Sequence, residues 1–389
     1  MAARVEERIV AGGDGGALVV HHLVLRGSNR AIGRHLGEIA RTRYGVEATA
    51  ARDPLRVRVQ AEWLRRNAPV LHERVRGAAD AFGVDAADDA YDVSRLGSPP
   101  PVAGCSAAFV PPRDAAGGHP LVSRAFDHAM PCGNRPRGCG PGADRPYLLE
   151  LHPSDGHATL AMVAFDLLGG ALDGINAEGL AVVAASDVEA AEARPLEPEA
   201  EPVGLDELQL GRHVLETCAN AIQAREALLA AKHHYAAYPV HWLVADRHGD
   251  AFAFEVGLGR NRAHLLEAAG LPLVLTNHAL HRHPEDEPLP AGPGPSGTYA
   301  RWRALRGALA EATAPWTPPA LAAAAARAFV EPPGGPGELP ADRTLWHGIY
   351  DLRERALEVT FLEREEPDPL RPGGLRTVRT PPLRLELRD

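Results

Sequence analysis

The pair Gly104-Cys105 is the first place in the sequence where residue types and spacing could support chemistry. A glycine leaves the peptide carbonyl that precedes the cysteine unshielded, and it tolerates backbone conformations that other residues avoid. A thiolate at Cys105 could attack that carbonyl, and hydrolysis of the resulting thioester would leave a free α-amine. In reference peptides an α-amine titrates at about 7.7 to 8.0 and a thiol at about 8.5, so this amine could accept the thiol proton. The alternative interpretation of Cys105 is a buried strand cysteine.

The elements that would position Cys105 change in character along the chain. Apolar residues at helical spacing between Val59 and Phe82, with Pro69 as a kink or restart, predict that the first hundred residues are mostly helical. Helices are also predicted at about 205–231, 298–310 and 319–329. Short apolar runs bounded by Gly, Pro or Asp predict strands at 106–110, 120–124, 147–151, 158–163, 180–183, 241–246, 251–255, 273–277, 345–350 and 357–361. Blocks of strands that alternate with helices favour an α+β sandwich over a parallel βαβ winding.

The overall composition indicates which classes of ligand the protein is expected to bind. A chain of 389 residues that is 45% hydrophobic can bury a large core, in one big domain or two modest ones. The net charge of −10 and the scattered arginines argue against nucleic acid as a partner. Because the sequence has neither a signal-peptide pattern nor a long uncharged apolar run, we expect a cytoplasmic protein without a membrane partner. A small-molecule substrate is the expected ligand.

Cysteine and histidine usage does not indicate a metal site or a disulfide scaffold. The chain has four irregularly spaced cysteines, Cys105, Cys132, Cys139 and Cys218. They are too few for a disulfide scaffold and lack zinc-knuckle spacing, so Cys132 and Cys139 are interpreted as reduced surface thiols. A histidine cluster lies beside two acids in a proline-rich segment, His278, His281, His283, Glu285 and Asp286. Because that segment lacks helical ligand spacing, we expect a solvated loop and neither a metal nor another cofactor.

Several short motifs occur in one order along the chain. They are Gly104-Cys105-Ser106, Ser123-Arg124-Ala125-Phe126-Asp127, Gly174-Ile175-Asn176-Ala177-Glu178-Gly179-Leu180, Thr276-Asn277-His278 and Thr298-Tyr299-Ala300-Arg301. Together they resemble the acyl-coenzyme A:6-aminopenicillanic-acid acyltransferase family, which belongs with the bile-salt and penicillin V amidases among the N-terminal-nucleophile (Ntn) hydrolases. The likeness covers most of the chain. It departs from the family at Ala125, where family members usually have Asn.

The resemblance implies a fold and a division of the chain. The fold would be a four-layer αββα Ntn-hydrolase sandwich, with two stacked antiparallel sheets covered by helices. Residues 1–104 would form a mostly helical propeptide, and residues 105–389 would form the catalytic domain that begins at Cys105. The family cleaves its own Gly-Cys junction, so the two parts would be processed subunits that remain associated. Whether they assemble further into a homo-oligomer stays open.

The resemblance also assigns roles to individual residues. Arg124 and Asp127 would line the Cys105 centre, with the guanidinium favouring the thiolate and the carboxylate holding the α-ammonium or an arginine. Asn277 would donate its NH₂ group to the oxyanion of a tetrahedral intermediate, and Arg301 would brace Asp127 or a substrate carboxylate. The competing interpretation is an ordinary structural ion pair for Arg124, Asp127 and Arg301, and a turn residue for Asn277. Further candidates for oxyanion or substrate contacts are Asn176, Ser186 and His278; the expected second oxyanion donor falls on Ser186 or Asp187.

The reaction implied is acyl transfer through a thioester on Cys105. A small amide or other acyl donor would acylate the sulfur, and water or an amine would then take the acyl group, as in a hydrolase or an acyltransferase of secondary metabolism. The residues do not separate these two outcomes. The basic residues Arg135, Arg137 and Arg145 are a faint indication of a site for a coenzyme A donor. A third interpretation is a binding or scaffold protein that keeps the fold without processing.

Overall fold

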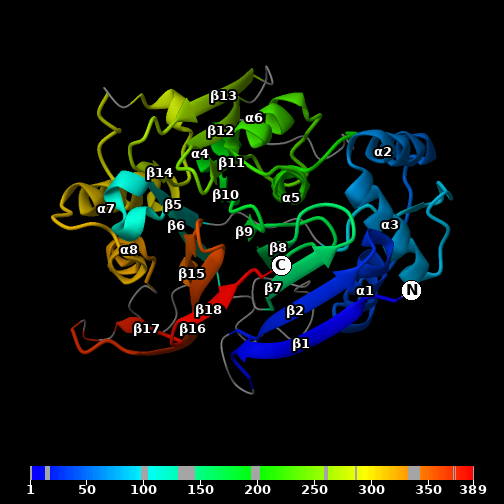
Figure 1. Ribbon diagram of the computed structural model, residues 1–389, viewed down its shortest axis with the longest axis horizontal. Helices are drawn as coiled ribbons and strands as arrows, with labels where there is room; N and C mark the ends of the chain where they lie inside the picture. The colour runs from blue at the N-terminus through cyan, green and yellow to red at the C-terminus, as the bar shows by residue number, and fades with distance from the viewer. Residues whose placement is uncertain are drawn as a thin grey trace.

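Two large β-sheets form the centre of the computed structural model (Figure 1). The structure describes residues 2–13, 18–97, 104–129, 145–193, 202–257, 262–284, 287–331, 342–370, 372 and 374–388. Cys132, Cys139, Arg135, Arg137, Glu285 and Asp286 therefore lie outside the described residues.

The larger sheet has nine strands. In spatial order they are β1 (Arg4–Ala11), β2 (Val20–Gly27), β7 (Tyr147–Pro153), β8 (Thr159–Val163), β9 (Asp173–Asn176), β10 (Ala181–Ser186), β11 (Val240–Ala245), β12 (Ala251–Gly257) and β13 (Arg262–Glu267). Neighbouring strands are antiparallel except β2 and β7, which pair in parallel. In Figure 1, β1 and β2 lie beside β7 and extend the sheet on that side.

The smaller sheet carries Cys105 and is antiparallel throughout its named pairs. Its order is β14 (Leu273–Leu275), β5 (Gly104–Val110), β6 (Leu121–Ala129), β15 (Asp342–Asp351), β16 (Ala356–Pro367) and β17 (Leu375–Arg379), and β18 (Leu383–Glu386) also pairs with β16. A separate short pair joins β3 (Thr49–Ala50) to β4 (Tyr91–Asp92).

Helices cover the outer faces of both sheets. Helix α5 (Glu207–Thr217) packs on β9 and β10, and α6 (Ala221–Ala230) packs on β11 and β12. On the other sheet, α7 (Thr298–Ala310) packs on β5 and β14, and α8 (Pro318–Ala325) packs on β6 and β15. The sheets themselves meet where β10 contacts β5 and β12 contacts β14. The predicted four-layer αββα sandwich is thereby confirmed, with one parallel strand pair that the prediction of antiparallel sheets did not include.

The N-terminal segment combines three helices with part of the larger sheet. The helices are α1 (Asn29–Arg43), α2 (Pro54–Asn67) and α3 (Pro69–Phe82), and α4 (Val188–Ala193) follows β10 much later in the chain. Pro69 is the first residue of α3, as the prediction of a restart requires. Strands β1 and β2 were not predicted. The predicted helix at 205–231 is two helices, because Asn220 caps a new helix by accepting a hydrogen bond from the backbone of Gln223.

A buried charge network joins α3 of the N-terminal segment to α5 on the larger sheet. Arg74 of α3 and Arg212 of α5 both donate to one carboxylate oxygen of Glu216. All three side chains are at most 3% exposed. Burial alone would raise the pKa of Glu216, but the two guanidinium groups hold that pKa below its ordinary value.

Among the helices that the structure describes, not one has the length and hydrophobicity needed to cross a bilayer.

We predict that Glu216→Ala lowers the free energy of unfolding by about 3–5 kcal/mol, because it leaves two buried guanidinium groups without their shared carboxylate. Denaturant unfolding followed by circular dichroism measures the change. The control is Arg225→Ala, which removes the exposed ion pair with Glu267 and should cost less than about 1 kcal/mol. Equal effects of the two substitutions would contradict a structural role for the buried network.

Candidate active site

Cys105 lies near the start of β5, between β14 and β6. In the β5–β6 ladder Cys105 is opposite Phe126, and Gly104 is opposite Asp127. Residues that face each other across an antiparallel pair project to the same side of the sheet, and successive residues alternate. The sulfur of Cys105 therefore lies in the main core with Ala107 and Phe109, whereas Asp127 projects to the opposite face, which α7 and α8 cover.

The space beside Gly104 explains why the residue before Cys105 has no side chain. A Cβ atom at this position would lie 2.9 Å from Cβ of Asp127 and 3.2 Å from its Oδ2 atom. The first distance is shorter than ordinary contacts between such atoms. The carboxylate of Asp127 therefore occupies the place that any larger residue at position 104 would need.

The main chain of Cys105 is held by two of the predicted residues. Its N–H donates to Oδ1 of Asn277 at 2.7 Å, and its carbonyl oxygen accepts from Nη1 of Arg301. Arg301 also donates to Oδ1 of Asn277 at 2.6 Å and to Oδ2 of Asp127 at 3.2 Å. Thr344 of β15 completes the carboxylate's contacts by donating to Oδ1 of Asp127 at 2.5 Å. Backbone nitrogen and carbonyl of Cys105 are thus fixed on one connected polar network.

The side chain of Asn277 has a defined orientation. Its Oδ1 atom faces two donors, and its Nδ2 group donates to the carbonyl oxygen of Ser186 at 2.8 Å. The backbone N–H of Asn277 donates to the hydroxyl of Thr298, the first residue of α7, at 2.7 Å. In the uncleaved chain the carbonyl of Asn277, and not its NH₂ group, therefore faces Cys105. Oxyanion donation by that NH₂ group stays a prediction.

Arg124 lies on the sulfur side of the sheet, two residues from Phe126 on β6. It is fully buried, and its Nε donates to Oδ2 of Asp173 at 3.2 Å. Burial opposes the charge, but hydrogen bonding and electrostatic attraction to Cys105, together with attraction to Asp173, raise the pKa of Arg124 above its ordinary value. A guanidinium in this place stabilises a thiolate at Cys105.

Two residues that sequence reasoning missed support Arg124. Asp173 is the first residue of β9, and Tyr350 of β15 donates its hydroxyl proton to Oδ1 of Asp173. Burial raises the pKa of the Asp173 carboxyl, which Arg124 and Tyr350 oppose only in part. The available signal was the position of Asp173 directly before the motif Gly174-Ile175-Asn176.

Of the remaining predicted contact residues, one joins the cluster and the others form no hydrogen bond with Cys105. Ser186 joins the cluster through its main-chain oxygen. Asn176 does not: its NH₂ group donates to the carbonyl oxygens of Leu215 and Cys218, so both amide hydrogens bind backbone at the end of α5. A substrate contact by this NH₂ group does not fit that geometry. His278 is buried behind Asn277, with Nδ1 at 2.9 Å from the Thr298 hydroxyl, and burial lowers the pKa of its imidazole to about 3.

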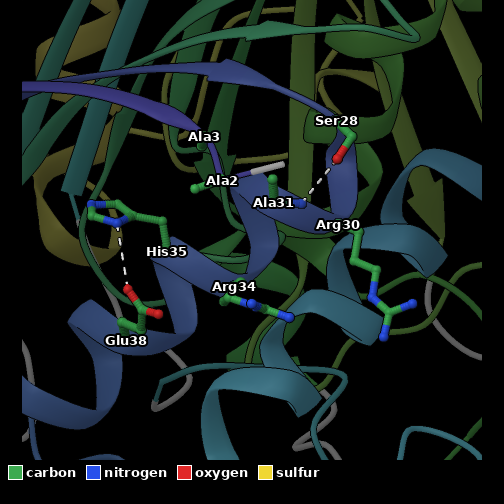
Figure 2. Close-up of a pocket in the computed structure, with 8 residues that line it drawn as sticks. All are labelled: Ala2, Ala3, Ser28, Arg30, Ala31, Arg34, His35 and Glu38. Carbon is green, nitrogen blue, oxygen red and sulfur yellow. Dashed lines mark hydrogen bonds and ion pairs between the residues drawn. The ribbon is translucent and has the colours of Figure 1, made fainter.

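The surface hollow of about 470 Å³ shown in Figure 2 lies away from this cluster. It is lined by Ala2, Ala3, Ser28, Arg30, Ala31, Arg34, His35 and Glu38, which come from the N-terminal end and α1. Within the described part of the chain, His, Cys, Asp and Glu side chains form no group of three that could hold a metal ion. In the uncleaved chain Cys105 is 2% exposed, so the sulfur is closed to a substrate.

Comparisons with known proteins bear on the resemblance that the motifs indicated. Residues 143–295 match the family model described as acyl-coenzyme A:6-aminopenicillanic acid acyl-transferase. This match covers less than half of the chain and includes neither Cys105 nor Arg301. It confirms the family resemblance inferred from the motifs. No curated protein matched the sequence significantly.

Solved structures with a similar chain path include a mutant of conjugated bile acid hydrolase from Clostridium perfringens and penicillin V acylase from Agrobacterium tumefaciens. The first has 14% identity and a TM-score of 0.45, and the match covers 71% of this chain and 92% of that one. The second has 14% identity and a TM-score of 0.44, with 68% of this chain and 84% of that one covered.

We predict that Gly104→Ala, made in a Cys105→Ala background to prevent processing, lowers the free energy of unfolding by about 1–3 kcal/mol because the new methyl group overpacks against Asp127. The matched control is Gly307→Ala in α7, where an added Cβ meets open space. That control should gain about 0.5–1 kcal/mol from the lower entropy cost of helix formation. Denaturant unfolding compares the two, and an equal gain at position 104 would show that Asp127 does not restrict this residue.

Proposed function

We propose that this chain is a self-processing cysteine enzyme of the N-terminal-nucleophile type. The precursor cleaves itself between Gly104 and Cys105, and Cys105 then forms an acyl-thioester from a small amide or another acyl donor. Water or an amine takes the acyl group. The observation that carries the proposal is the convergence of Arg124 on the sulfur and of Asn277 and Arg301 on the main chain of one cysteine.

In the cleavage step, the Cys105 sulfur would form a bond to the carbonyl carbon of Gly104, and the bond from that carbon to the Cys105 nitrogen would break. The nitrogen gains a proton and becomes an amine, while the thioester retains the upstream segment. Water then adds to the thioester, which leaves a carboxylate on Gly104 and restores the thiol. Arg124 supports this sequence because it favours the thiolate, and Gly104 supports it because it has no side chain of its own to shield its carbonyl.

After cleavage, the new amine would remain beside Oδ1 of Asn277, which accepts from the same nitrogen at 2.7 Å in the uncleaved chain. Asp127 lies against Gly104 and would supply a negative charge close to the ammonium form. The amine can then accept the thiol proton as Cys105 attacks a substrate carbonyl, and return it to the departing amine. Once it is no longer bonded to Cys105, Gly104 would move away from the sulfur and open it to the substrate, while the two parts remain associated.

Intact mass spectrometry tests the processing step. We predict that purified protein gives two fragments, residues 1–104 and 105–389, whereas Cys105→Ala stays whole because it lacks the nucleophile. Cys218→Ala is the matched control, since Cys218 is also a buried free cysteine but lies at the end of α5, and it should be processed like the parent. A parent protein that keeps its full-length mass after prolonged incubation would instead indicate a nonprocessing protein with the same fold.

An acceptor competition assay separates hydrolysis from transfer. Once an acyl donor has been found by a screen of N-acyl amino acids and β-lactam amides, primary amines are added at saturating concentration. For an acyltransferase we predict that the amide product increases at the expense of the free acid, because amine and water compete for one thioester. Product ratios that do not respond to any amine would identify the enzyme as a hydrolase.

A further inference from the structure

A buried histidine–glutamate pair lies beside the turn that carries Asn277. His241 of β11 and Glu255 of β12 are each 1% exposed, and Nδ1 of His241 is 3.1 Å from Oε1 of Glu255. Nε2 of His241 is 2.6 Å from the carbonyl oxygen of Thr276. Neither side chain forms a hydrogen bond with Cys105, and the motifs of the sequence did not single out His241.

The hydrogen-bond partners fix the charge of this pair. A carbonyl oxygen only accepts, so Nε2 of His241 must carry a hydrogen that it donates to Thr276. The carboxylate of Glu255 accepts from the backbone N–H of Leu280 at 2.7 Å and of His281 at 2.9 Å, and Nδ1 of His281 lies 2.6 Å from it. A carboxylate surrounded by donors is ionised, so Nδ1 of His241 donates to it as well. Both ring nitrogens of His241 are therefore donors, and the ring is an imidazolium.

The surrounding charges agree with an imidazolium at position 241. Burial opposes the charge, but Glu255 and Asp187, which precedes α4, raise the pKa of His241 above its ordinary value. Burial likewise opposes the charge on Glu255, but His241 and His281 hold the pKa of that carboxyl well below its ordinary range. Other ionisable groups close to the pair include His278, whose low pKa keeps it neutral, His264, whose pKa is lowered chiefly by burial, and Tyr235, whose pKa burial raises, while Arg282 acts on Asp187.

The pair contacts both ends of the turn between β14 and the 3₁₀ helix Leu280–Arg282. His241 binds the carbonyl of Thr276, immediately before Asn277, and Glu255 binds the backbone N–H groups of Leu280 and His281 behind it. Between these two anchors, Oδ1 of Asn277 accepts the N–H of Cys105. Charge-assisted hydrogen bonds of this kind are shorter and stronger than neutral ones.

We propose that the His241–Glu255 pair is a positioning clamp, which holds the Asn277 turn at both ends and thereby fixes the nitrogen of Cys105 for cleavage and for later proton transfer. This inference rests on the proposed function for its catalytic consequence. The clamp itself acts on the geometry of the turn, so it can be tested in a protein that performs no chemistry.

The test is amide hydrogen exchange in the uncleavable Cys105→Ala protein, which keeps the N–H group at position 105. His241→Gln retains a donor for Thr276 but has no second donor or charge for Glu255. We expect exchange at least about tenfold faster in peptides that cover residues 276–281 and at the backbone N–H of residue 105. The control is His22→Gln, which breaks another buried histidine–glutamate pair, with Glu150 at 2.9 Å, in the same sheet but on β2. Equal protection of these peptides in the two variants would overturn the clamp.

A second variant and a spectroscopic measurement cover the case in which His241→Gln does not fold. Glu255→Gln keeps the side-chain size and should accelerate exchange in the same peptides. In the Cys105→Ala protein, histidine nitrogen NMR at about pH 8 should show a ring with both nitrogens protonated, because an unperturbed histidine, with a pKa of about 6.5, is neutral there. A spectrum in which every histidine is neutral would overturn the proposal even without a folded variant.

The catalytic consequence is measured in the processing protein. His241→Gln should slow formation of the two fragments and lower kcat with little change in KM, since the clamp contacts no substrate, whereas His22→Gln should leave both unchanged. If the parent protein neither cleaves itself nor turns over any substrate, the proposed function fails, while the exchange result still decides the clamp. If the parent is active and His241→Gln matches it in rate, the positioning role fails alone.

Discussion

The pairing of β5 with β6 is the constraint on which the rest of the site depends. Alternation along an antiparallel strand sends the Cys105 sulfur to one face of the sheet and leaves Gly104 against Asp127 on the other. The thiol and its guanidinium partner Arg124 therefore lie between the sheets, while Asp127 lies on the face that α7 covers and contacts Arg301 of that helix. Charged groups therefore lie on both faces of the sheet beside the peptide that joins residues 104 and 105.

Several buried charged side chains lie around β5, and each forms an ion pair with a particular residue. Arg124 pairs with Asp173, and Arg301 with Asp127. A buried ion pair contributes little net stability compared with apolar packing, but breaking one is costly, so such pairs restrict a structure to one arrangement. In this protein that restriction falls on the atoms that flank Cys105, where small displacements would matter most for attack on a carbonyl.

Much of the sandwich was predictable from the sequence because its central strands are short apolar runs between turn residues, as in β7, β11 and β12. Strand β1 escaped prediction because it is a mostly exposed edge strand rich in Arg and Glu. The motifs also predicted one cluster that contains Cys105, Arg124, Asp127, Asn277 and Arg301. Asp173 and His241 were not found in this way, because Asp173 meets Arg124 and Tyr350, and His241 meets Thr276, only in the folded chain. The orientation of the Asn277 amide likewise depends on Ser186 and Arg301, far away in sequence.

The parallel pairing of β2 with β7 has a consequence for the order of events during biosynthesis. Strand β2 is synthesised early, but its partner β7 is complete only after residue 153. The β2–β7 ladder therefore forms late and joins segments that lie far apart in the sequence. Without β2, the backbone groups of β7 would form an open sheet edge prone to wrong association. The N-terminal segment therefore completes the larger sheet by covering this edge of β7.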